Sequence, residues 1–288
     1  MDESDRPTPV VQRRRLRVEL RRARLDAGLT QGEVADAMEW SLSKLIRIEA
    51  GSVNISTNDL RMLLHKYQIE DADRTSDLVA LARAARERSW WSGYRDIISP
   101  QFFQFLEYEA AASVIRNFEP LLVPGLLQTE DYAAAATRRL SGRSAEEASD
   151  SLLELRMRRQ DLLDRPDPPL LFFILDDAVA RRVVGGKAVM HSQLRHLIDM
   201  ADRPNVTIEI ISFDVGIHPG MAGPFVIHEF PDAADDDVLY LEGQGGVVRQ
   251  DSVDEISSYR ETFEQLREAS LGPESSVTYL RNLADKII

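Results

Sequence analysis

The first third of the chain shows apolar stripes of helical period, separated by residues that typically begin and end helices. A first helix is predicted from apolar residues that recur on one face: Leu16, Leu20, Ala23 and Ala27. Gly28 stands where a glycine commonly ends a helix. Thr30 is the expected cap of a second helix, with Glu33 completing a capping box. Ser41 is the expected cap of a third helix that runs to about Glu49.

Two further helices complete this part. A fourth is predicted to begin with Thr57 as its cap, and a fifth runs from about Asp73 to Glu87. Both present inward-facing apolar residues at helical spacing: Leu60, Leu63, Leu64 and Tyr67, then Leu78, Leu81, Ala82 and Ala85. Two short helices joined by three or four residues are typical of a helix-turn-helix motif, although generic helical hairpins look similar.

The remaining pattern changes from helices to strands near residue 165. Helices are expected from Pro100 to about Ile115, after Thr129, and from about Ala145 to Leu163. Four short strands are predicted beyond them: Leu170–Leu175, Val206–Phe213, Phe225–Phe230 and Val238–Glu242. The predicted fold class is mainly α with an α+β C-terminal part: five N-terminal helices, a helical segment, and a mixed sheet of about four short strands.

Composition sets limits on this picture. A length of 288 residues fits two or three domains, which we place at 10–88, 89–165 and 166–288. A content of 43% hydrophobic and 29% charged residues excludes a disordered chain. No apolar run approaches the roughly 20 residues of a membrane helix and the N-terminus is acidic, so we expect a cytoplasmic protein. The count of 0 cysteines excludes disulfides and thiolate metal sites.

The distribution of charge changes what the total implies. A net charge of −13 argues against nucleic acid as a partner. Residues 6–66, however, hold 12 Lys and Arg against 7 Asp and Glu, a local net charge of +5, and the remainder carries −18. Such asymmetry indicates either a nucleic-acid-binding segment or a solvated basic helix. The motif that follows the basic cluster favours the nucleic-acid interpretation.

From about Leu16 to Ile69 the chain resembles the lambda-repressor-like (XRE-family) DNA-binding domain, most clearly in Gly28-Leu29-Thr30-Gln31 and Ser41-Leu42-Ser43-Lys44-Leu45-Ile46-Arg47-Ile48-Glu49. The resemblance implies that the third helix enters the major groove of double-stranded DNA. The base contacts it implies are Leu42, Ser43 and Arg47, and the phosphate contacts are Gln31, Ser41 and Lys44. Leu42 has the alternative of a semi-exposed packing residue. Arg24 and Glu49 correspond to a structural ion pair of the family.

Four aromatic residues mark the junction between the domains. Trp90 and Trp91 stand side by side, and Phe102 and Phe103 follow shortly after. They form either a ligand pocket or an interdomain plug, and buried aromatics favour the plug.

The resemblance continues into the C-terminal part. Glu109 with Ala110, the run Leu122-Val123-Pro124-Gly125-Leu126-Leu127-Gln128-Thr129, and Tyr240-Leu241-Glu242 are similar to actinobacterial (Streptomyces-type) helix-turn-helix regulators with one shared C-terminal domain of uncharacterised role. These WhiJ-like regulators are described as antitoxin-like because a small partner protein is often encoded beside them. The resemblance therefore implies DNA, a second copy of the chain, and either a partner protein or a small-molecule effector as partners.

The sequence offers little for catalysis. His191 and His196 are five residues apart, so they do not share a helix face as metal ligands would. The glycine-rich Gly243–Gly246 lacks the Lys-Ser/Thr of a phosphate-binding loop and is expected to be a turn. We expect no catalytic residues, metal or cofactor, and predict a transcriptional regulator that binds a palindromic operator as a homodimer. The alternative is an antitoxin-like protein that sequesters a small partner and binds DNA for autoregulation.

Overall fold

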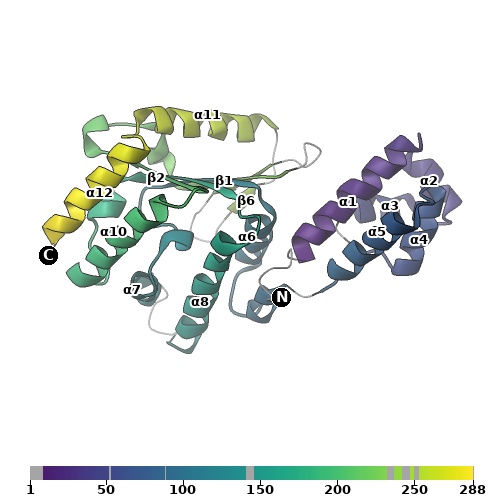
Figure 1. Ribbon diagram of the computed structural model, residues 1–288, viewed down its shortest axis with the longest axis horizontal. Helices are drawn as coiled ribbons and strands as arrows, with labels where there is room; N and C mark the ends of the chain where they lie inside the picture. Colours follow the sequence, from purple (N-terminus) through teal and green to yellow (C-terminus); the bar gives the residue numbers. More distant parts are fainter. Residues whose placement is uncertain are drawn as a thin grey trace. The chain divides into compact units, whose positions relative to one another are not determined.

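The computed structural model describes residues 9–51, 53–87, 89–140, 146–231, 237–241, 247–249 and 253–287. The predicted turn at Gly243–Gly246 lies outside these residues. The chain divides into two compact units, 1–92 and 93–288 (Figure 1). Within the described residues no helix is long and apolar enough to cross a membrane.

The first unit is a bundle of five helices. They are α1 (Pro9–Asp26), α2 (Gln31–Ala37), α3 (Leu42–Glu49), α4 (Thr57–Lys66) and α5 (Ala72–Ala84). Gly28 and Gly51 follow α1 and α3 with φ of +68° and +71°, which glycine adopts without steric cost. The predicted cap of α4 is wrong by one residue, because the Ser56 hydroxyl accepts the hydrogen bond from the Asp59 amide at 3.0 Å. Most of the residues predicted to face inward lie in one buried core, which includes Leu20, Leu60 and Leu63.

The second unit is built on a six-stranded mixed sheet of order β3-β2-β1-β4-β5-β6. The strands are β1 (Val114–Glu119), β2 (Leu170–Asp176), β3 (Val206–Ile211), β4 (Phe225–Glu229), β5 (Val238–Leu241) and β6 (Val247–Arg249). Strands β1, β2 and β3 are parallel, and β4, β5 and β6 continue the sheet antiparallel on the other side of β1. The fold class is confirmed, and the sheet has two strands more than predicted, β1 and β6.

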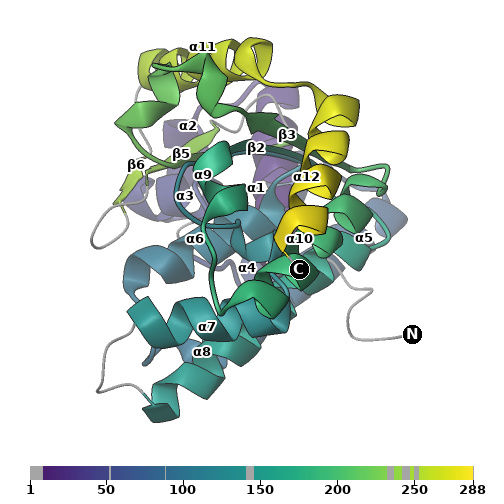
Figure 2. The ribbon, with the colours of Figure 1, turned by 90° about the vertical axis from the view of Figure 1, so that its left-hand side faces the viewer.

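Helices cover both faces of this sheet (Figures 1 and 2). The longer ones are α6 (Pro100–Ala111), α7 (Glu130–Leu140), α8 (Glu146–Arg158), α10 (Lys187–Ala201), α11 (Val253–Ala269) and α12 (Pro273–Ile287). Short helical turns are η2 (Trp90–Tyr94), η3 (Gly125–Leu127), η4 (Arg159–Asp164), α9 (Asp177–Arg181), η5 (Phe213–Val215) and η6 (Pro219–Ala222). One face packs on α11 through Phe118, Phe225 and Phe263. The other faces α6, α7, α8 and α10 (Figure 1).

The predicted helix from Pro100 to Ile115 is wrong at its end. Helix α6 stops at Ala111, and Ile115 belongs to β1, which pairs with both β2 and β4. The segment 89–165 therefore supplies a central strand of the sheet in addition to helices.

Candidate DNA-binding surface

Local hydrogen bonds fix the starts of the two helices of the motif. The Thr30 hydroxyl accepts from the Glu33 amide at 3.3 Å, and the Glu33 carboxylate accepts from the Thr30 amide at 2.8 Å. This backbone hydrogen bond lowers the pKa of Glu33. At α3 the Ser41 hydroxyl accepts from the Lys44 amide at 3.2 Å. Both predicted caps are therefore present, so the sequence itself sets where α2 and α3 begin.

A buried carboxylate ties three of the helices together. Glu49, 6% exposed at the end of α3, accepts from Arg24 of α1 through Nε at 2.7 Å and a second guanidinium nitrogen at 3.1 Å. It also accepts from the side-chain amide nitrogen (Nε2) of Gln31 at 2.7 Å and from the Tyr67 hydroxyl at 3.5 Å. The hydrogen bond to Glu49 raises the pKa of Arg24, and burial raises that of Tyr67. Arg24 and Glu49 thus form the contact that the resemblance implies, with Gln31 added to it.

The outer face of α3 is exposed and carries a mixture of apolar and polar side chains. Leu42 is 48% exposed and Ile46 44%, whereas Leu45 on the opposite face is fully buried. Ser43 and Arg47 lie on the exposed face beside them. Arg47 donates through Nε to the Ser43 carbonyl at 3.3 Å, a hydrogen bond that does not use its two terminal nitrogens. This face can meet both the hydrogen-bonding edges and the methyl groups of bases. The sequence pattern did not point to Ile46, because its exposure depends on which side of α3 packs against the core.

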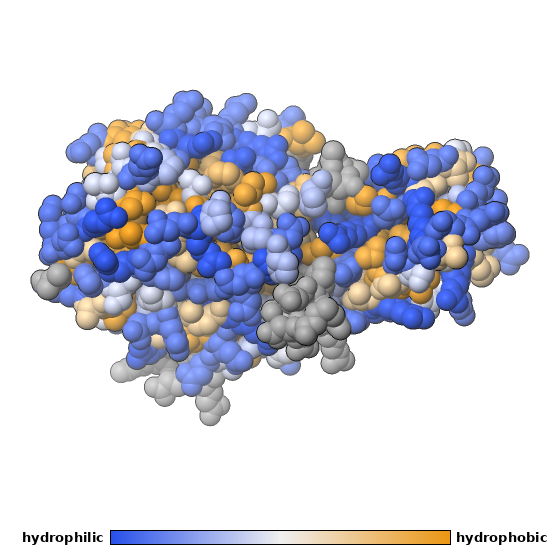
Figure 3. Space-filling view, in the orientation of Figure 1, coloured by the Kyte–Doolittle hydropathy of each residue, from blue (hydrophilic) through white to orange (hydrophobic). Residues whose placement is uncertain are grey.

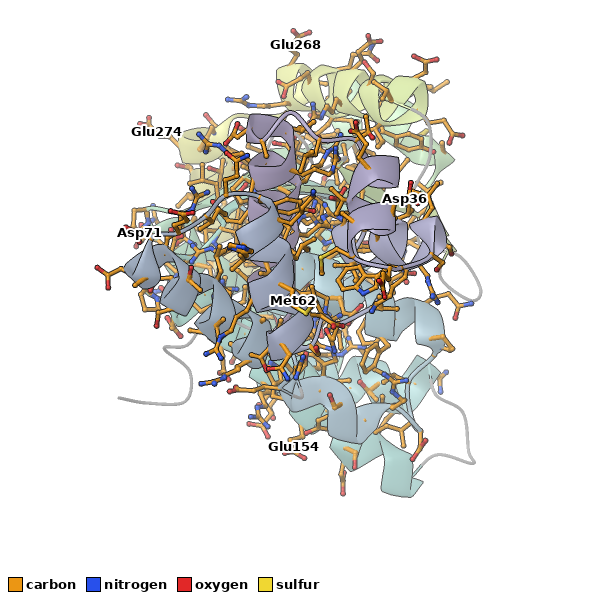
Figure 4. All side chains as sticks on the ribbon, turned by 90° about the vertical axis from the view of Figure 1, so that its right-hand side faces the viewer. Asp36, Met62, Asp71, Glu154, Glu268 and Glu274 are labelled. Atoms are coloured by element: carbon orange, nitrogen blue, oxygen red, sulfur yellow. The ribbon has the colours of Figure 1, made fainter. Side chains whose placement is uncertain are left out.

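The three candidate phosphate ligands lie at helix starts but are not equally free. Lys44 pairs with Asp59 of α4 at 3.2 Å, and its ammonium lies 3.8 Å from the centroid of the Trp40 ring. Gln31 holds Glu49, and the Ser41 hydroxyl caps α3. Their backbone N–H groups stand in the first turns of α2 and α3, where helix termini favour anions. Figure 4 shows the helices of this unit with Asp36 of α2 and Asp71 at the start of α5 on opposite sides.

The four aromatic residues of the predicted pocket divide between the two units. Trp90 and Trp91 contact each other edge to face at 5.4 Å, and Trp91 is buried. Phe102 and Phe103 lie in α6, where Phe102 stacks on Phe105 at 5.8 Å and Arg95 lies over the Phe103 ring. A shared ligand pocket stays a prediction.

The second unit has a polar interior beneath α6. Glu109 accepts from Arg159 Nε at 2.9 Å and from a terminal nitrogen at 2.6 Å, and both side chains are at most 10% exposed. The Arg159 guanidinium also lies over the rings of Phe102 and Phe105, at 5.3 and 5.2 Å. The pair therefore links α6 to η4 in the middle of the unit.

His228 of β4 belongs to the same interior. It is 0% exposed, and among the described residues neither ring nitrogen has a hydrogen-bond partner. Phe105 contacts the ring edge to face at 5.1 Å. Burial lowers the pKa of His228 to about 3, and the Arg159 charge acts in the same direction. His228 is consequently neutral in the folded protein at physiological pH.

Acidification should weaken the second unit through His228. In the unfolded chain His228 takes up a proton below about pH 6.5, whereas in the folded state it does so only near pH 3. The free energy of unfolding therefore decreases as the pH is lowered from about 6.5 towards 3. At pH 5 we expect a loss of about 2 kcal/mol relative to neutral pH, at about 1.4 kcal/mol per pH unit. Urea unfolding at pH 7 and pH 5 measures it, and a His228→Leu variant should lose this part of the difference. Equal pH dependence in the two proteins would contradict the assignment.

Among the described residues, no group of three or more His, Asp and Glu side chains could hold a metal ion. His218 of the segment before β4 instead bonds the Asp176 carboxylate through Nε2 at 3.2 Å.

The five-helix unit and its exposed α3 define a helix-turn-helix DNA-binding protein. Residues 15–76 match the family described as a helix-turn-helix domain. Residues 102–282 match a domain of unknown function (DUF5753), and since this match spans more than half of the chain, the protein belongs to that family. Together the two matches support a helix-turn-helix regulator of XRE type. Neither a curated protein nor a solved structure shows a significant match.

Proposed function

We propose that the protein is a sequence-specific transcriptional regulator that binds a palindromic operator in the cytoplasm as a homodimer. The observation that carries this proposal is the exposed outer face of α3, held by the caps of α2 and α3 and by the Glu49 network. A helix presented in this way fits the major groove, with two half-sites about 34–36 Å apart in a two-fold dimer.

The chemistry of the α3 face suggests which bases it contacts. Arg47 can donate two parallel hydrogen bonds to a guanine, and Ser43 can bond several bases. Leu42 and Ile46, both exposed, can pack on thymine methyl groups. The proposed half-site therefore combines a guanine with one or more thymines.

Phosphates would be bound around this face by Gln31, Ser41 and Lys44. Lys44 is half-exposed and paired with Asp59, so it would exchange a carboxylate for a phosphate on binding. Gln31 would bind a phosphate through its backbone N–H in the first turn of α2, while its side chain stays hydrogen-bonded to Glu49. Such phosphate contacts fix the position of the protein along the DNA, and the affinity that they supply decreases as the salt concentration rises.

The C-terminal unit is proposed to dimerise and to respond to a partner protein or a small ligand. Residues 93–288 carry 19 Lys and Arg against 33 Asp and Glu, so this unit repels DNA and favours a basic partner. The same acidity favours the second candidate function, an antitoxin-like protein that sequesters a small basic partner and regulates its own gene. Genome-wide occupancy at many unlinked promoters favours the regulator, whereas occupancy confined to its own promoter favours the second candidate.

Replacement of Arg47 by alanine should relax recognition at one position of each half-site. Loss of a paired arginine–guanine contact costs about 1–3 kcal/mol, or roughly ten- to a hundredfold in affinity for the preferred base. Binding to a library of single-base operator variants measures this. The matched control is Arg22→Ala on the exposed face of α1, which should leave base preferences unchanged. Equal discrimination by Arg47→Ala and wild type would refute the assignment.

A further inference from the structure

The segment from Ser212 to Pro224, between β3 and β4, presents apolar side chains to solvent. Its four large exposed hydrophobic residues are Phe213 (57%), Val215 (38%), Ile217 (92%) and Met221 (64%). We call these four side chains the apolar edge. Isolated exposed hydrophobics are ordinary, but a group within one short segment marks an interaction site. Figure 3 shows hydrophobic surface at the upper left, where the green ribbon of this segment runs in Figure 1.

Contacts to the sheet hold this segment in one conformation. The His218 ring is buried, bonds Asp176 at the end of β2 and lies edge to face against Phe118 of β1. A Cβ on Gly220 would lie 2.4 Å from the Phe118 ring, so the backbone at Gly220 packs directly against this side chain of β1. Arg181 of α9 lies over the Phe213 ring at 5.6 Å. The apolar edge is thus presented by an ordered scaffold, which lowers the entropic cost of association.

Charge favours a second copy of this chain as the occupant. Residues 93–288 have a net charge of −14, yet Asp214 is the one Asp, Glu, Lys or Arg among the 13 residues from Ser212 to Pro224. A basic partner would bind more tightly to a surface rich in carboxylates, and this segment contains only one carboxylate, Asp214. Two copies of an acidic unit, in contrast, repel each other least where few charges lie, and an apolar patch can complement itself in a two-fold interface.

We therefore propose that the apolar edge is the homodimer interface, with Ile217 at its centre and the same four side chains contributed by each copy. The proposal rests on the proposed function only because both expect a homodimer, and it names the surface through which the two copies associate.

The test is sedimentation equilibrium of the full chain, comparing wild type with Ile217→Asp. An isologous interface loses two isoleucines and gains two buried carboxylates, so the dimer dissociation constant should rise at least about a hundredfold. The matched control is Val253→Asp at the start of α11, where the side chain is 76% exposed and an aspartate suits the helix N-terminus. It should dimerise as wild type does. Because Ile217 is exposed, both variants should keep the wild-type circular dichroism spectrum at room temperature, which shows that each variant is folded.

Two results would overturn the proposal: an Ile217→Asp variant that dimerises as tightly as wild type, or a wild-type protein that is monomeric at micromolar concentration. Binding of the protein to a single half-site distinguishes failure of the interface proposal from failure of the proposed regulator function. Ile217→Asp should retain wild-type base preferences on a half-site, since α3 is untouched. A wild-type dimer without base preferences would instead refute the regulator and leave the interface standing.

Discussion

Replacing Glu49 by alanine should unfold the DNA-binding unit at a much lower temperature and abolish DNA binding with it. The variant removes the carboxylate that pairs with the Arg24 guanidinium, which is 10% exposed, and it also removes the hydrogen-bond acceptor for Gln31 and Tyr67. Removal of one partner of a buried ion pair typically costs about 3–5 kcal/mol. In a unit of this size each kcal/mol corresponds to about 4–8 °C in Tm. Hydrogen exchange resolved by peptide should place the loss in residues 9–87.

Two companion variants separate this loss from a general charge effect. Asp36→Ala removes an exposed carboxylate from α2 and should leave the melting temperature within a degree or two of wild type. The double variant Arg24→Met with Glu49→Leu removes both buried charges and should recover part of the stability, because no charge is then left unpaired although Gln31 and Tyr67 still lack their acceptor. A Glu49→Ala protein that melts as wild type does would show that the pair has no structural role.

Much of the DNA-binding unit could be predicted because its information is local. The caps at Thr30 and Ser41 and the glycine after α1 are set by residues within a few positions of each helix end. The contacts that depend on distant residues could not be found in this way. Asp59, which pairs with Lys44, comes from another helix, and Gln31 reaches Glu49 across 18 positions.

The sheet shows where a sequence pattern fails. Strand β2 is a continuous apolar run, and its pattern predicted a strand. Strand β1 carries Arg116 on one face and Asn117 on the other, so neither face shows an uninterrupted apolar pattern. Arg116 is accommodated because Glu229 of β4 and Glu264 of α11 accept its hydrogen bonds. Both partners lie more than 100 residues away, and the strand can be recognised only once they are in place.

Replacing Glu109 by alanine should destabilise the second unit as strongly as Glu49→Ala destabilises the first. The carboxylate is 5% exposed and accepts two hydrogen bonds from Arg159, and the alanine variant removes both of these bonds from a buried position. We expect a loss of about 3–5 kcal/mol in the free energy of unfolding. Stacking on Phe102 and Phe105 keeps the guanidinium in place, so it cannot easily turn to water. Hydrogen exchange should report the loss in peptides from β1, α6 and η4.

The matched control is Glu261→Ala on the exposed side of α11, which should change stability by no more than about 0.5 kcal/mol. A conservative Glu109→Gln variant keeps one acceptor for Arg159 and should lie between alanine and wild type. The position of the loss is the decisive measurement, since Glu109→Ala should leave exchange in α2 and α3 unchanged while Glu49→Ala should affect it directly. If Glu109→Ala instead leaves β1 fully protected, the ion pair contributes nothing to the sheet, and the aromatic packing of α6 alone holds this part of the unit together.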